Sequence, residues 1–322
     1  MHPLASRGPR TDITDILVRR HTGAVPNETR ASSEKVVRSG ETVGPARQRA
    51  AVLGSPIRFS LSPVLHQAAY ATLGLTGWRY EAFDCAAAAL PAFLAGLGPE
   101  WAGLSLTMPL KRVALTLADE VSPLAGKVGA ANTLLLGQPG GRRRAENTDV
   151  AGIVGALREA GLEQAGTAVV LGAGGTAQAA LAALREFGQL TPSVLVRDPA
   201  RTTELRAAAD RLGLGVRIVG GLPDVEWPEA DVVISTLPPG ADDTLRPPRW
   251  SAGTVLLDVV YTPWPTPLAA AARAAGCQVA SGLAVLLHQA VAQVELMTGR
   301  RAPVASMRAA LDAAVRSRSG PD

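Results

Sequence analysis

Short apolar runs alternate with alanine-rich helical segments between residues 149 and 280, and this alternation constrains the fold more than any other feature of the 322-residue chain. The runs at 168–171 and 193–196 have the length and composition of buried strands, and the segment at 175–188 has helical periodicity. Strands that alternate with helices form a parallel sheet with helices on both faces. The sequence therefore predicts a doubly wound, Rossmann-like α/β domain over residues 149–280.

The flanking sequence predicts a second α/β domain that is assembled from two separate parts of the chain. Residues 48–148 also alternate between apolar runs and helical segments, which predicts a mainly parallel sheet. The last two helical segments have no strand between them, so we expect them to pack back on this first region. The first domain is then discontinuous, at 48–148 and 281–318, with a cleft between it and the second domain.

The expected elements follow from these patterns. Strands are expected at 50–54, 78–83, 101–106, 128–136, 145–148, 168–171, 193–196, 216–219, 231–235, 255–258 and 278–280. Helices are expected at 63–73, 86–97, 109–117, 150–160, 175–188, 199–212, 266–275, 283–298 and 303–316. The helix at 109–117 is expected to open at Pro109, and the run Arg142–Arg144 is expected to form a solvated hairpin tip.

The charge of the chain is concentrated at its start. Residues 1–50 hold nine of the 32 Lys and Arg residues and five of the 28 Asp and Glu residues, which leaves 23 of each in the remainder. A neutral globular part argues against a nucleic-acid enzyme. Residues 1–47 are polar and weakly periodic, so we expect a disordered N-terminal extension with at most a short helix near 12–19.

Apolar runs and cysteines give the expected compartment. The apolar runs are short and broken by Gly, Pro or Arg, so no transmembrane span and no membrane partner are expected. Cys85 and Cys277 lie far apart and do not make a disulfide framework. The sequence therefore predicts a cytoplasmic protein.

A glycine-rich turn joins the first strand and helix of the second domain. Gly172 permits a tight turn, and Gly174 lets backbone amides approach a pyrophosphate, whose charge a helix N-terminus favours. The alternative is a structural strand–helix turn without a ligand, but the strand, the helix and the βα unit that follows favour dinucleotide binding. The predicted cofactor-binding residues of this turn are Gly172, Ala173, Gly174, Gly175, Thr176 and Ala177.

The end of the next strand indicates which dinucleotide binds. An NAD site usually has an acidic residue there, whereas this chain has Val196 followed by Arg197 and, one turn on, Arg201. Two guanidinium groups can hold a 2′-phosphate, which predicts NADP. Asp198 can touch a ribose hydroxyl, but Asp198-Pro199 is also a favourable helix start, which is the interpretation we prefer. The alternative for both arginines is a solvated helix start.

Polar groups follow apolar runs at two further places. Lys111 ends the segment 105–111 and offers an ammonium for proton transfer, and Asp149 ends 146–149 and offers a carboxylate to hold it or the substrate. Together with the glycine-rich turn they indicate a nucleotide-dependent enzyme that acts on a small polyhydroxy acid. Ser60 and Ser62 precede a helix and suit a carboxylate, although simple capping by Ser62 is an open alternative.

The remaining histidines and acids do not suggest a metal site. His66 and His288 are polar groups near these motifs, and packed or solvent-facing positions are the preferred interpretation for both. No His, Cys and carboxylate spacing typical of a metal centre is found.

Several linked motifs, in order along residues 50–300, resemble the shikimate dehydrogenase family. They are GSPIRFSLSP (54–63), SLTMPLK (105–111), GAANT (129–133), ENTD (146–149), LGAGGTA (171–177), VRDPAR (196–201), DVVYTP (258–263) and SGLAVLLHQA (281–290). The resemblance implies reversible NADPH-dependent reduction of 3-dehydroshikimate to shikimate, in the shikimate pathway of aromatic amino acid biosynthesis. A monomer and a homodimer are both compatible with it.

The resemblance also implies residue roles. Lys111 and Asp149 would be the catalytic pair. Ser60 and Ser62 would bind the substrate carboxylate, and Thr107, Asn132 and Gln289 would hydrogen-bond the substrate. Tyr261 would lie near the substrate, and Val259 and Gly282 near the nicotinamide. The substrate-binding residues implied are Ser60, Ser62, Thr107, Asn132, Asp149, Tyr261 and Gln289.

Four positions depart from the family pattern, and two other functions stay open. Phe59 stands where His is frequent, Ser105 where Asn is frequent, and Ala284 and Val285 where Gly and Met are usual. None of these changes removes an acid–base group. The alternatives are an NAD-dependent quinate/shikimate dehydrogenase and a non-catalytic sensor of shikimate or NADP.

Overall fold

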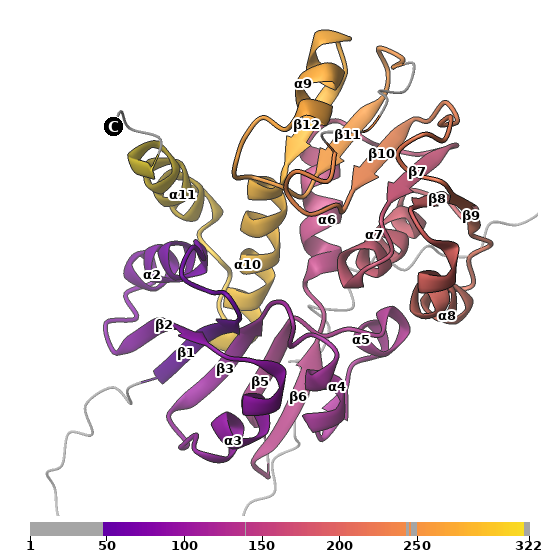
Figure 1. The fold of residues 1–322 in the computed structure, drawn as a ribbon. Helices are drawn as coiled ribbons and strands as arrows, with labels where there is room; N and C mark the ends of the chain where they lie inside the picture. The colour runs from indigo at the N-terminus through magenta and orange to yellow at the C-terminus, as the bar shows by residue number, and fades with distance from the viewer. Residues whose placement is uncertain (1–47, 139, 243–244, 246–249, 319–322) are drawn as a thin grey trace, which may run out of the picture. The chain divides into compact units, whose positions relative to one another are not determined.

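The structure is a computed structural model that describes residues 48–138, 140–242, 245 and 250–318, and it contains two six-stranded sheets with helices packed on them (Figure 1). Both expected α/β regions are therefore present. The predicted disorder of 1–47 and the short helix near 12–19 lie outside the described residues. The exact domain boundaries stay predictions.

The second sheet is parallel throughout, with strand order β12-β11-β10-β7-β8-β9. Its strands are β7 (Ala168–Leu171), β8 (Ser193–Val196), β9 (Arg217–Gly220), β10 (Val232–Ser235), β11 (Val255–Asp258) and β12 (Gln278–Ser281). Successive residues of a strand face opposite sides: Val170 packs in one core and Val169 in the other. The first core includes α6 (Asp149–Glu159), α7 (Gly175–Glu186) and α8 (Thr203–Leu212), and the second includes α9 (Pro267–Ala274). Helices thus cover both faces, which confirms the doubly wound fold.

The first sheet is mixed, with strand order β2-β1-β3-β5-β6-β4. Its strands are β1 (Gln48–Gly54), β2 (Trp78–Asp84), β3 (Trp101–Leu106), β4 (Glu120–Val121), β5 (Thr133–Gln138) and β6 (Arg142–Glu146). The expectation of a mainly parallel sheet is wrong at β5, which pairs antiparallel with both β3 and β6. A short turn joins β5 to β6, and a connection of that length can only join antiparallel strands.

The expected hairpin is present, but the arginine run at 142–144 begins its second strand and does not form the tip. Arg142 begins β6, and the turn lies before it at Gly140 and Gly141, which both have positive φ. Arg144 lies 2.7 Å from Glu146 and 3.6 Å from Glu120 in ion pairs. Opposite charges on the same strand, at Glu146, and on the neighbouring strand β4, at Glu120, explain why the run is tolerated inside the sheet.

A helix that was not expected precedes β5. Helix α5 (Pro123–Val128) begins where the Ser122 hydroxyl accepts a hydrogen bond from the Ala125 amide at 3.2 Å, and it ends at Gly129, whose φ is +78°. The strand expected at 128–136 therefore starts only at Thr133. The Ser-Pro start and the Gly end are ordinary helix signals, but no element is expected at 118–127.

The helix expected at 109–117 is shorter, and Pro109 does not open it. Helix α4 spans Val113–Leu117, and residues 108–112 form turns instead. The Leu110 amide donates to the Thr107 carbonyl at 2.8 Å, and the Thr107 amide donates to the Leu53 carbonyl at 2.9 Å. This turn, tied to the end of β1, carries Lys111.

The remaining helices cover the two faces of the first sheet. They are η1 (Ala87–Ala89), α3 (Leu90–Ala95), α2 (Ser62–Thr72), α10 (Gly282–Thr298) and α11 (Val304–Arg318), and a 3-10 turn, η2 (Pro199–Thr202), precedes α8 in the second region. The segment expected as one helix at 86–97 is thus split into η1 and α3, because the first turn is 3-10. Leu287 and Met307 share a core with Ala50 and Val52 of β1, which confirms that the last two helices pack back on the first sheet.

Helix α10 also packs against α6 at two glycines. A Cβ at Gly152 would lie 2.8 Å from the Val285 carbonyl oxygen, and one at Gly155 would overlap the His288 ring. The two helices approach one another so closely that side chains larger than hydrogen do not fit. No helix in the described ranges is long and apolar enough to cross a membrane.

Candidate active site

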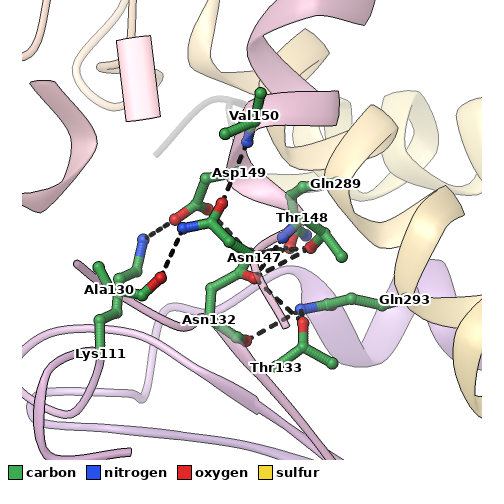
Figure 2. Close-up of polar contacts among 10 residues, drawn as sticks. All are labelled: Lys111, Ala130, Asn132, Thr133, Asn147, Thr148, Asp149, Val150, Gln289 and Gln293. Carbon is green, nitrogen blue, oxygen red and sulfur yellow. Dashed lines mark hydrogen bonds and ion pairs between the residues drawn. The ribbon is translucent and has the colours of Figure 1, made fainter. Parts of the chain in front are cut away.

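The centre of the site is an ion pair between Lys111 and Asp149 (Figure 2). Asp149 is the first residue of α6, and Lys111 lies in the turn after β3. The lysine Nζ lies 2.6 Å from the carboxylate Oδ2, and the two side chains are 21% and 11% exposed. The pair is thus partly desolvated, which strengthens it, and it keeps enough exposed surface to meet a ligand.

Asn132 holds the other oxygen of the carboxylate. Its Nδ2 donates to Asp149 Oδ1 at 2.9 Å and to Thr148 Oγ1 at 2.9 Å. The Thr148 amide donates to Asn132 Oδ1 at 2.7 Å, and since a backbone N–H can only donate, this contact sets which end of the side-chain amide is which. Asn132 therefore presents its N–H groups to the carboxylate.

Asn147 ties the segment before α6 to the rest of the first region. Its Nδ2 donates to the Ala130 carbonyl at 2.8 Å, and its Oδ1 accepts from the Val150 amide at 3.3 Å. The second contact satisfies one of the free amides of the first helical turn. Asn147 thus fixes the backbone just before and just after Asp149, and so helps to position its carboxylate.

Gln289 of α10 completes this constellation (Figure 2). Its Oε1 lies 3.4 Å from Asn132 Nδ2, and its Nε2 donates to the Leu286 carbonyl at 2.9 Å. Four of the predicted site residues, Lys111, Asn132, Asp149 and Gln289, are therefore brought together from four separate segments.

The predicted serines lie at the start of α2. Ser62 is the first residue of the helix and is buried, and its amide donates to Ser60 Oγ at 3.3 Å. The N-cap position is Leu61, and no side chain caps the helix, so the alternative in which Ser62 is a simple cap is wrong. Thr107 is half-buried at the end of β3, and its methyl group lies where a Cβ at Gly54 would have to be.

Tyr261, Val259 and Gly282 are neighbours. A Cβ at Gly282 would overlap the Val259 carbonyl and lie 3.2 Å from Tyr261 Cδ1, so only glycine fits. Burial raises the pKa of the Tyr261 phenol, and the nearby Arg318 opposes that shift. The tyrosine therefore stays a neutral hydrogen-bonding group near neutral pH.

The glycine-rich turn has the geometry that the sequence predicts. Gly172 has φ +97°, and a Cβ there would lie 2.7 Å from Thr236 Oγ1. Gly174 is the extended N-cap of α7, which begins at Gly175, and Ala177 is buried against the sheet. Nothing lies within 4 Å of the Cβ position at Gly174, which leaves space above the first amides of the helix.

Arg197 and Arg201 are exposed after β8, beyond the buried Val196. Neither forms an ion pair with any described residue. The Asp198 Oδ1 accepts from the Ala200 amide at 2.9 Å, so Asp198 is the N-cap of η2, as expected. One carboxylate oxygen of Asp198 is thus bonded to the backbone, and Asp198, Arg197 and Arg201 are all exposed.

The two histidines are not part of the constellation. His66 is fully buried and stacks on Tyr80 with a ring-centroid distance of 3.9 Å, and burial lowers its pKa to about 3. His288 Nε2 lies 2.9 Å from Glu159 Oε2. Among the residues that the structure describes, no cluster of His, Cys, Asp and Glu could hold a metal ion.

Comparison with known proteins places the chain among relatives. The profile of the "Shikimate dehydrogenase substrate binding domain" matches residues 52–134, and that of the "Shikimate 5'-dehydrogenase C-terminal domain" matches 282–311. The shikimate dehydrogenase (NADP(+)) of Moorella thermoacetica is 40% identical over 281 residues, which cover 84% of this chain and 94% of that protein. The chain belongs to the shikimate dehydrogenase family.

Solved structures agree with this membership. The shikimate dehydrogenase of Mycobacterium tuberculosis is 46% identical with a TM-score of 0.72, over 83% of this chain and 99% of that one. The quinate dehydrogenase of Corynebacterium glutamicum in complex with NAD is 30% identical with a TM-score of 0.72, over the same 83% and 99%. The family fold thus includes more than one substrate and cofactor.

The departures from the family pattern lie around the constellation rather than in it. Phe59 is exposed at 64%. Ala284 and Val285 are half-buried in the first turns of α10 and pack against the core that contains α6. Ser105 points to Gln293 of α10, a residue that the sequence analysis did not select. Gln293 is one helical turn beyond Gln289, and this spacing was the only signal for it.

Proposed function

We propose that the protein is a shikimate dehydrogenase that interconverts 3-dehydroshikimate and shikimate with NADPH and NADP. The observation that carries the proposal is the Lys111–Asp149 pair at 2.6 Å, held by Asn132, in a chain of this family. The reaction is a step of aromatic amino acid biosynthesis. Both cysteines are free thiols, which supports a cytoplasmic location.

Lys111 is proposed as the group that moves the proton. When a ketone is reduced, negative charge develops on its oxygen, and a proton donor beside that oxygen stabilises the transition state. The Lys111 ammonium can give its proton there, and in the reverse direction the neutral amine takes the proton of the alcohol. NADPH, when bound, supplies the hydride.

Asp149 is proposed to hold both the lysine and the substrate. Its Oδ2 faces Lys111, and its Oδ1 faces Asn132, so the carboxylate cannot rotate without breaking one contact. An ionised acceptor in this position aims the ammonium and receives a hydrogen bond from a substrate hydroxyl. Placing the reacting groups in advance lowers the entropic part of the barrier.

The remaining predicted residues are proposed to bind the substrate around this pair. Ser60 and Ser62 at the start of α2 offer hydroxyls, and the helix N-terminus favours the substrate carboxylate. Thr107, Gln289 and Tyr261 offer neutral hydrogen-bonding groups. Because Tyr261 stays protonated near neutral pH, it can donate to an anionic substrate.

The residues that follow the carboxyl ends of four strands of the second sheet fit NADP. Gly172 and Gly282 each stand where a Cβ would fill space or overlap backbone, which suits the close approach of a dinucleotide. Gly174 and Gly175 would place helix amides at the pyrophosphate. Arg197 and Arg201 would hold the 2′-phosphate. Val259 would lie at the nicotinamide beside Gly282.

The test mixes the purified protein with shikimate or quinate and with NADP or NAD, in all four combinations. The absorbance of the NADPH or NADH that forms measures turnover. We expect the highest kcat/KM for shikimate with NADP. A preference for quinate with NAD would support the rival dehydrogenase, which the Asp198 contact with the backbone disfavours. Absence of turnover with all four combinations would overturn the enzymatic function and leave the sensor.

A further inference from the structure

A buried row of hydrogen bonds runs from β2 to the catalytic carboxylate. The Tyr80 hydroxyl donates to Ser105 Oγ at 2.6 Å, and Ser105 Oγ donates to Gln293 Oε1 at 2.8 Å. Gln293 Nε2 donates to Thr133 Oγ1 at 2.9 Å and to the Asn132 carbonyl at 3.2 Å. These contacts join β2, β3, β5 and α10 below the site.

The hydrogen bonds continue into the site, and each donor still points toward Asp149. Thr133 Oγ1 donates to Asn132 Oδ1 at 3.1 Å, and Asn132 Nδ2 donates to Asp149 Oδ1 at 2.9 Å (Figure 2). Every group from Tyr80 onward therefore donates toward the carboxylate, whose other oxygen faces Lys111. We call the residues Tyr80, Ser105, Gln293, Thr133 and Asn132 the donor row.

The direction of the row is set by groups that have no choice. The Asn132 carbonyl can only accept, so the end of Gln293 that faces it is the NH₂ group, and the opposite oxygen must accept from Ser105. A carboxylate likewise can only accept, which orients the Asn132 amide. The two amides thus align the hydroxyls between and beyond them.

The donor row is shielded from water. Gln293 is 1% exposed, and Tyr80, Ser105, Thr133 and Asn132 are at most 3% exposed. His66 stacks on Tyr80 and, with its pKa lowered to about 3 by burial, is neutral there. Hydrogen bonds in such surroundings polarise one another, and an unpaired member costs free energy.

We infer that Gln293 is a positioning residue for the reaction, which acts through Asn132 and Thr133 to hold Asp149 and, through it, Lys111. The inference rests on the proposed function. Gln293 does not reach the substrate itself, because it is 1% exposed and its side-chain amide is bonded to Ser105 and Thr133, whereas Gln289, one turn earlier, lies 3.4 Å from Asn132 Nδ2. Gln293 instead contacts both the backbone and the side-chain partner of Asn132, and Asn132 holds the carboxylate.

The first test replaces Gln293 with methionine, which keeps the length and volume but removes both hydrogen-bonding groups. We expect kcat for shikimate oxidation to fall about 10-fold, because a small misplacement of reacting groups is expensive in rate. The KM for NADP should not change, since the donor row lies between the first sheet and α10, whereas the glycine-rich turn proposed for NADP follows β7 of the second sheet. An unchanged kcat would overturn the inference.

Gln189 is the matched control. It is buried, donates to the Gly166 carbonyl at 2.7 Å and accepts from the Thr191 amide at 2.6 Å, but lies between α7 and β8. Gln189→Met should lower Tm as Gln293→Met does and leave kcat unchanged. If both variants lower kcat equally, Gln293 is only structural and the inference is wrong.

A double-variant cycle tests the path. If Gln293 acts through Asp149, then Gln293→Met should lower kcat by less than about 2-fold when Asp149→Asn is already present. A full additional 10-fold loss in that background would show that Gln293 does not act through Asp149.

Tyr80→Phe removes one oxygen and keeps the ring that stacks on His66, so it is the variant of the donor row that should disturb folding least. We expect Tyr80→Phe to lower kcat by about 2-fold to 3-fold, less than Gln293→Met, because polarisation weakens along a row of hydrogen bonds. No change in kcat for this variant, with a loss for Gln293→Met, would restrict the inference to Gln293. Turnover by the unaltered protein separates the two proposals. Without it both the function and the inference fail, whereas turnover with an unaffected Gln293→Met variant overturns only the inference.

Discussion

At the scale of single residues, the surroundings of Lys111 distinguish it from the other lysine of the described residues. Lys111 is four-fifths buried beside a carboxylate, whereas Lys127 at the end of α5 is exposed. Charge alone therefore does not define the candidate proton donor. Its position in a turn between β3 and α4, opposite the start of α6, does so.

Lys111→Met keeps the aliphatic stem and removes the proton donor. We expect kcat to fall by about 10²-fold to 10⁴-fold, the usual contribution of general acid–base catalysis, and Tm to fall as well, because Asp149 loses its ion-pair partner. Steady-state kinetics with NADP and shikimate measure the loss. Lys127→Met is the matched control and should retain full activity. A Lys111→Met variant with full activity would falsify the assigned role.

His66 links stability to pH. Its pKa in the folded protein is lowered to about 3 from the ordinary value of 6.5, so between these values the unfolded chain binds a proton that the folded one does not. Acidification therefore removes stability from pH 6.5 down to about 3. Between pH 7 and pH 5 the loss from this group is about 2 kcal/mol.

The measurement is urea unfolding at both pH values for the unaltered protein and for His66→Asn. The unaltered protein should lose about 2 kcal/mol more than the variant over this interval. Both values lie above the range in which ordinary carboxylates titrate, so the difference belongs to the histidine. An equal loss in both proteins would show that His66 is already protonated or exposed.

At the scale of elements, the contact between α6 and α10 connects Asp149, the proposed catalytic carboxylate, to Gln289. Gly152 of α6 faces Val285 and Gln289 of α10, so the spacing of the helices depends on the absence of a side chain. Helix propensity alone favours alanine over glycine by up to about 1 kcal/mol. The tertiary contact is expected to reverse that preference.

Gly152→Ala should lower stability by about 1–3 kcal/mol, because the added Cβ meets a backbone carbonyl at 2.8 Å that cannot move alone. The control is Gly126→Ala in α5, where the nearest atom is Val121 Cγ1 at 3.8 Å, and which should be neutral or stabilising. Denaturant unfolding of both variants measures the difference. A stabilised Gly152→Ala variant would contradict the close packing of α6 and α10.

At the scale of the whole molecule, cofactor binding should stabilise the fold by mass action. Ligand at 100 times its Kd adds about 2.7 kcal/mol. We expect NADP to raise Tm more than NAD at equal concentration, because Arg197 and Arg201 are exposed and without ion-pair partners among the described residues. Thermal unfolding with each nucleotide measures the shift.

The double variant Arg197→Ala and Arg201→Ala should remove the difference between the two nucleotides. Arg217 is the control, because it is an exposed arginine at the first residue of β9, whereas ligands of such sheets bind at the carboxyl ends of the strands. Arg217→Ala should leave the preference for NADP intact. A larger stabilisation by NAD in the unaltered protein would refute the role of the arginines.

Local patterns predicted much of this fold. The parallel second sheet, the glycine-rich turn and the cap at Asp198 were predicted because each depends on residues adjacent in sequence. Lys111 and Asp149, which the motifs select, lie together in an ion pair, and their catalytic role stays a prediction. The errors include the short helix α5, at which no element was expected, and the strand β5, whose direction depends on its neighbours in the sheet.

By itself, then, the sequence determined the fold class, the family resemblance and the residues that we propose for acid–base chemistry and nucleotide binding. Only the tertiary structure decided that Gln293 accepts from Ser105, 188 residues earlier, and that Asn132 donates to Asp149. Hydrogen bonds between distant segments leave no periodic trace in the sequence, because burial and mutual orientation arise only after the strands and helices have packed. The donor row that leads to the Lys111–Asp149 pair is a property of that packing.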